Sequence, residues 1–74
     1  MSKLPKISGK AAVSALSKIG YGIDHQTGSH MILRQSAPPN RRLTIPNHKE
    51  LATGTLRAII RQAGLTVEEF MNLL

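Results

Sequence analysis

The chain has 74 residues, with ten Lys and Arg against four Asp and Glu, and a formal net charge of +6. This length predicts one domain, residues 1–74, with no room for a separate cofactor-binding domain. The absence of cysteine excludes disulfides and thiolate metal sites and is consistent with the cytoplasm. We expect no signal peptide and no membrane span, because the apolar runs are too short. The positive charge indicates a polyanionic partner, with nucleic acid favoured over a membrane.

The first predicted element is a helix over residues 9–19. Ser8 can cap its start, and Gly20 supplies its stop. Apolar side chains recur at helical spacing, at Ala12, Val13, Leu16 and Ile19.

The centre of the chain predicts three antiparallel strands joined by short connections. The first strand alternates with Tyr21 and Ile23 on one face, and residues 26–28 form the turn that follows it. Residues 36–40 must form a loop, because two consecutive prolines cannot donate to a sheet ladder. The predicted strands are residues 21–25, 29–35 and 41–45.

The second strand contains a continuous apolar run that does not alternate. Either Met31 and Leu33 or Ile32 alone must point into the core. We expect Met31 and Leu33 to point inward. His30, Ile32 and Arg34 then lie on an open face of the sheet.

The last third of the chain predicts two helices. Residues 54–63 place an apolar stripe on one side, and Gly64 ends the helix. Thr66 and Glu69 have capping-box spacing, which opens a short last helix in which Phe70, Leu73 and Leu74 can pack. The order predicts an α+β domain, with helices on one face of a three-stranded antiparallel sheet. Double-stranded-RNA-binding domains have this arrangement, which leaves the other face of the sheet open.

The segment TLRAIIRQAGLTVEEFMNLL also suggests a helix-turn-helix that binds DNA. Its second helix would open with Val67, Glu68 and Glu69 and carries no Lys or Arg. Because acidic side chains there would repel phosphates, we expect no direct DNA binding by this chain alone.

Two stretches, GSHMIL and LTIPNHKELATGTLRAIIRQAGLTVEEF, together resemble the HicA family of toxins. Members of that family pair a Gly-Ser-His or Gly-Gly-His strand entrance with a Val/Ile-Pro-x-His and a Gly-Thr-Leu helix start. The resemblance implies an α-β-β-β-α fold and a toxin that cleaves mRNA and is neutralised by a HicB-type antitoxin. It also implies that cleavage centres on the strand histidine, which is His30 here.

The chemistry of RNA cleavage suits a histidine at this position. The 2′-hydroxyl of RNA can attack the neighbouring phosphorus, so an enzyme needs mainly a proton acceptor, a proton donor and positive charge. A histidine side chain in general exchanges protons near neutral pH, and the small residues Gly28 and Ser29 would let the RNA backbone approach His30. Asp24, Ser29 and the substrate itself are candidates for the other proton-transfer step. The alternative is an RNA-binding module of the same fold without catalysis.

Metal-dependent cleavage is disfavoured. The four carboxylates are scattered along the chain, and no further ligand is spaced to complete a zinc site with His25 and His30. We therefore expect no metal and no cofactor.

RNA binding must come mainly from charge, because the two aromatic residues, Tyr21 and Phe70, both fit the core and provide no stacking platform. His48 suits either a structural or an RNA-contacting role, and we expect His25 to be solvent-exposed. The candidate RNA contacts are Ser29, Lys6, Lys10, Arg34, Arg41, Arg42, Lys49 and Arg57.

Overall fold

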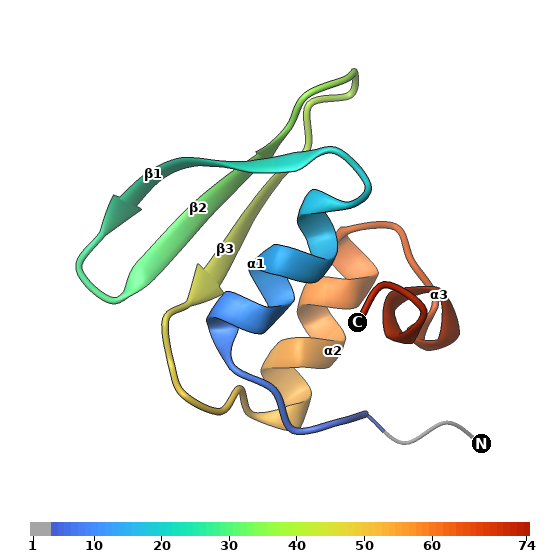
Figure 1. Ribbon diagram of the computed structural model, residues 1–74. Coiled ribbons are helices and arrows are strands. Elements are labelled where there is room, and N and C mark those ends of the chain that lie inside the picture. The colour runs from blue at the N-terminus through green and yellow to red at the C-terminus, as the bar shows by residue number, and fades with distance from the viewer. Residues whose placement is uncertain (1–3) are drawn as a thin grey trace.

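The computed structural model describes residues 4–74 and has the predicted α+β architecture (Figure 1). A three-stranded antiparallel sheet, in the order β1-β2-β3, carries helices on one face and leaves the other open. This arrangement confirms the predicted fold class. The elements are α1 (Gly9–Ser17), β1 (Tyr21–Thr27), β2 (His30–Gln35), β3 (Arg42–Pro46), α2 (Thr53–Gln62) and α3 (Val67–Met71).

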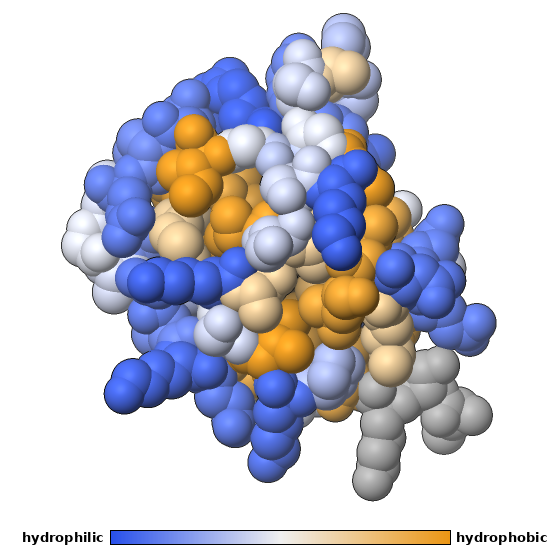
Figure 2. All heavy atoms as spheres, viewed as in Figure 1, coloured by the Kyte–Doolittle hydropathy of each residue, from blue (hydrophilic) through white to orange (hydrophobic). Residues whose placement is uncertain are grey.

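The core lies between the sheet and the helices. Met31 and Leu33 are 3% and 0% exposed, whereas Ile32 between them is only partly buried, so the predicted orientation of β2 is confirmed. Figure 2 shows apolar residues gathered in the middle of this view, with hydrophilic residues around them. The core side chains are Ala12, Ala15, Leu16, Tyr21, Met31, Leu33, Leu43, Ile45, Leu51, Leu56, Ile59, Ile60, Ala63 and Phe70.

The start of helix α1 contacts the end of β3 and the segment that follows it. Ser8 caps the helix as predicted, because its hydroxyl accepts a hydrogen bond from the Ala11 amide at 3.0 Å. The Gly9 amide donates to the His48 carbonyl at 2.9 Å, and a Cβ on Gly9 would overlap the Pro46 carbonyl oxygen. The contact therefore requires glycine, and it holds α1 close to the end of β3.

The first hairpin differs from the prediction. Thr27 pairs with His30, so β1 continues two residues beyond His25, and only Gly28 and Ser29 form the turn. Gly28 has a φ of +51°, which glycine adopts without strain at the first central position of a two-residue turn. The predicted turn at residues 26–28 was therefore wrong.

Strand β1 lies at the edge of the sheet, so some of its side chains are exposed to solvent. Tyr21 and Ile23 share one face, as predicted, and this face is directed toward the helices, since Ile23 pairs with the buried Leu33. Tyr21 is 3% exposed, but Ile23 is 53% exposed because it has a strand on one side only.

The other boundaries lie within two residues of the predicted ones. Helix α1 ends at Ser17 and β3 runs one residue later than expected. The predicted capping box is present in α3, where Thr66 and Glu69 each bond the backbone of the other. None of the helices over residues 4–74 is long and apolar enough to cross a bilayer.

Candidate active site on the open face of the sheet

The uncovered face of the sheet carries both charged and titratable side chains. Because Met31 and Leu33 face the helices, the alternate residues of β2 face outward, and cross-strand partners share a face. The outward residues of β2 are His30, Ile32 and Arg34. On β1 and β3, His30 lies between Thr27 and Pro46, and Ile32 lies between His25 and Thr44. Arg34 lies between Gly22 and Arg42.

His30 stands at one end of this face, directly after the turn. Its side chain is exposed, and among residues 4–74 the ring has no hydrogen-bond partner. The turn before it is held in place, because the Ser29 carbonyl accepts a hydrogen bond from the Asn47 amide at 2.6 Å. His30 thus combines a fixed backbone with an imidazole that is free to meet a ligand.

A β-bulge in β1 brings two further titratable groups to the same face. Ile23 pairs with Leu33 and His25 pairs with Ile32, so Asp24 is an extra residue between them. Neighbours in a regular strand point to opposite faces, but a bulge turns both side chains the same way. The Oδ2 atom of Asp24 therefore lies 2.9 Å from Nδ1 of His25.

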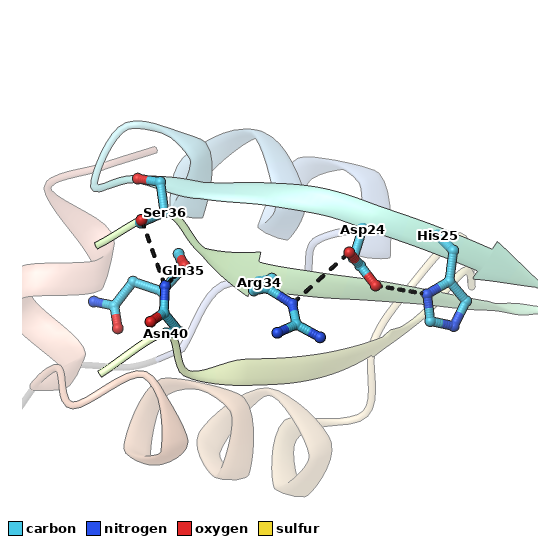
Figure 3. A network of polar contacts seen from close by, with 6 residues as sticks. All are labelled: Asp24, His25, Arg34, Gln35, Ser36 and Asn40. Carbon is cyan, nitrogen blue, oxygen red and sulfur yellow. Dashed lines mark hydrogen bonds and ion pairs between the residues drawn. The ribbon is translucent and has the colours of Figure 1, made fainter. Parts of the chain in front are cut away.

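The other carboxylate oxygen of Asp24 faces β2. Its Oδ1 atom lies 3.8 Å from Nε of Arg34, so that Asp24 stands between Arg34 and His25 (Figure 3). The hydrogen bond from the His25 ring is the main reason that the pKa of the Asp24 carboxyl lies below its usual value. The positive charges of Arg34 and, more weakly, Arg42 act in the same direction. Asp24 is therefore a carboxylate at neutral pH.

This network was not predicted from the sequence. Asp24 was expected only as a candidate for proton transfer, and His25 was expected to be exposed, which it is. The strand pattern places adjacent residues on opposite faces, so only the bulge reveals that the two side chains meet. No local sequence signal identified that bulge.

Four of the predicted RNA-contacting cations form two groups, one on the open face and one beside the turn that carries His30. Arg34 and Arg42 are paired across β2 and β3 on the open face. Lys10 and Lys49 line a shallow pocket at the start of α1, together with Ser8, Asn47 and His48. Asn47 also bonds the Ser29 carbonyl, so this pocket adjoins the turn that carries His30.

Three other predicted contacts belong to neither group. Arg41 donates from Nη1 to the Gln62 carbonyl at 3.3 Å, at the end of α2. Arg57 is exposed on α2, in the layer behind the sheet. Lys6 is exposed in the segment that precedes α1. Within residues 4–74, no three His, Asp or Glu side chains gather as a metal site would require.

Comparison with known proteins identifies the family. Residues 9–65 match the family model described as the HicA toxin of bacterial toxin-antitoxin systems. A search of curated proteins found no significant match. The matched region covers well over half of the chain and includes α1, the whole sheet and α2. The chain therefore belongs to the HicA family and is a toxin of a toxin–antitoxin system.

Proposed function

We propose that this toxin is a metal-independent endoribonuclease that cleaves mRNA in the cytoplasm, with His30 as a general acid/base. The observation that carries the proposal is the position of His30. Its imidazole, which has no hydrogen-bond partner among residues 4–74, stands on the open face of the sheet, after a turn of two small residues. A Cβ on Gly28 would meet only open space, so an RNA backbone has room to approach.

The proposed reaction is an internal transfer at phosphorus. The 2′-oxygen loses its proton and bonds to the adjacent phosphorus, while the bond from phosphorus to the 5′-oxygen breaks and that oxygen gains a proton. The products are a 2′,3′-cyclic phosphate and a 5′-hydroxyl. Lys10 and Lys49, which line the pocket beside the turn that carries His30, would offset the negative charge of the phosphate.

RNA would lie across the open face and reach the pocket beside it. Lys10, Lys49 and the Ser29 hydroxyl are the proposed contacts at the His30 end, and Arg34 and Arg42 those at the other end. Lys6, Arg41 and Arg57 would contact a longer RNA that extends around the domain. Tyr21 and Phe70 are both buried, so bases find no aromatic platform, and we expect low sequence specificity.

A HicB-type antitoxin is the proposed protein partner. Ile32 lies in the middle of the open face, between His25 and Thr44 and flanked along the strand by His30 and Arg34. An apolar centre surrounded by polar groups is typical of a protein interface. A partner bound there would cover His30 and block access of RNA.

The test is cleavage of a mixed RNA by the wild-type protein and by His30→Ala, both in the presence of a chelator. We expect wild-type cleavage with cyclic phosphate ends and a rate for His30→Ala that is lower by roughly 10²- to 10⁴-fold. Equimolar antitoxin should stop the wild-type reaction. Cleavage that requires a divalent ion would contradict the metal-independent mechanism. If neither protein cleaves while both bind RNA equally, the toxin is an RNA-binding module.

A further inference from the structure

A second histidine shares the open face with His30. His25 pairs with Ile32, and Ile32 is two residues beyond His30 on β2, so the two histidines are diagonal neighbours across β1 and β2. Such neighbours are separated by about 7–8 Å, which long side chains can span. Both side chains are exposed, and a phosphate lying on the face would sit between the two rings.

The orientation of the His25 ring is fixed by its partner. An ionised carboxylate only accepts hydrogen bonds, so Nδ1 of His25 is the donor in its 2.9 Å contact with Asp24. The proton on Nδ1 leaves Nε2 as the atom available for exchange with a substrate. Asp24 is itself held from the other side by Arg34 (Figure 3).

In-line cleavage of RNA places the two oxygens that exchange protons on opposite sides of phosphorus. One imidazole beside the phosphate cannot easily serve both oxygens in one step, whereas two imidazoles on either side can. The carboxylate of Asp24 accepts the Nδ1 proton of His25 in either state of the ring, so it holds the ring in one orientation through the reaction. His30 has no such partner within residues 4–74, and its free ring suits the base.

We propose that His25 is a second catalytic residue, the general acid of the cleavage reaction, and that Asp24 is its positioning residue. This inference rests on the proposed ribonuclease function. His30 takes the proton of the 2′-hydroxyl as the new bond to phosphorus forms. Nε2 of His25 gives its proton to the 5′-oxygen as the old bond breaks. The proton count balances, and the two histidines exchange their protonation states.

The test compares two versions of one short RNA that contains the linkage cleaved fastest by the wild-type protein in mixed RNA. One version has the natural 5′-oxygen at that linkage, and the other has a bridging 5′-sulfur. Thiols are much stronger acids than alcohols, so a thiolate leaves without a proton. We expect His25→Ala to cleave the oxygen version about 10²-fold more slowly or worse and the sulfur version within 10-fold of the wild-type rate. His30→Ala should be slow on both versions.

Gln26→Ala is the matched control, because Gln26 is exposed on the same strand but pairs with the inward-facing Met31. It should cleave both versions at the wild-type rate. Asp24→Asn should cleave the oxygen version more slowly than the wild type, but with a smaller loss of rate than His25→Ala. As for His25→Ala, the sulfur version should restore most of that rate. The inference would be overturned if His25→Ala cleaved the oxygen version at the wild-type rate. It would also be overturned if His25→Ala lost the same fraction of the cleavage rate on both versions. In either case normal wild-type cleavage and a slow His30→Ala would leave the proposed function standing. If the wild-type protein cuts no RNA, both proposals fall.

Discussion

At the scale of single residues, the fold alters the protonation of Asp24. Its carboxyl has a folded-state pKa below the usual 3.8, mainly through the hydrogen bond from His25. A lowered pKa means that the folded state binds its proton less tightly than the unfolded chain does. The contact therefore stabilises the fold above the unfolded pKa, and this contribution is lost as the pH falls through the folded pKa. Because Asp24 is exposed, the effect on the free energy of unfolding should be small and reduced by salt.

The pKa itself is the sharper quantity to measure. We expect the NMR titration of the Asp24 carboxyl carbon to have its midpoint below 3.8. His25→Ala removes the largest cause of the shift, so the midpoint should rise, while Arg34 still holds it partly down. Gln26→Ala, on the same strand, should leave it unchanged. A wild-type midpoint at or above 3.8 would show that Asp24 and His25 do not pair in solution.

At the scale of elements, the contact between α1 and the end of β3 depends on Gly9. A methyl group there would meet the Pro46 carbonyl oxygen, which is backbone and cannot rotate away. We expect Gly9→Ala to lower the free energy of unfolding by about 1–3 kcal/mol, as other overpacking substitutions do. Urea denaturation measures this change.

Gly54→Ala is the matched control for Gly9→Ala. Gly54 also lies in the first turn of a helix, but a Cβ there meets nothing within 4 Å. Alanine has a higher helix propensity than glycine. The control should therefore leave the free energy of unfolding unchanged or raise it by up to about 1 kcal/mol. Equal losses for the two variants would mean that the close approach of α1 to Pro46 does not occur.

The elements also show how far sequence alone predicts this molecule. Local chemistry marks helix ends, so the caps at Ser8 and Thr66 and the layer arrangement were predicted correctly. The apolar run of β2 does not alternate and allowed two orientations, and the expected one, with Met31 and Leu33 inward, is confirmed and places His30 on the open face. The bulge at Asp24 was not predicted, because it depends on how β1 and β2 pair rather than on a local signal. The meeting of Asp24 with His25 was missed for the same reason.

At the scale of the whole molecule, a formal charge of +6 attracts RNA whichever face is used, so affinity alone does not locate the binding surface. The arrangement of the cations does distinguish surfaces. Lys49 lines the pocket beside the turn that carries His30, whereas Arg61 is exposed in the last turn of α2. Substitution of either residue by Gln removes one positive charge, so both variants lower the net charge of the protein equally. Only Lys49→Gln changes the proposed contact surface for RNA.

Salt dependence separates these two effects. Each phosphate contact to single-stranded RNA contributes about 0.7 to the slope of log K against log salt concentration. With His30→Ala as the background, so that the RNA stays intact, Lys49→Gln should flatten the slope by about 0.7 and Arg61→Gln should leave it nearly unchanged. Fluorescence anisotropy of a labelled RNA over a salt series measures both slopes. Equal flattening would mean that RNA responds to net charge and not to a defined surface, and the proposed path of RNA beside His30 would be wrong.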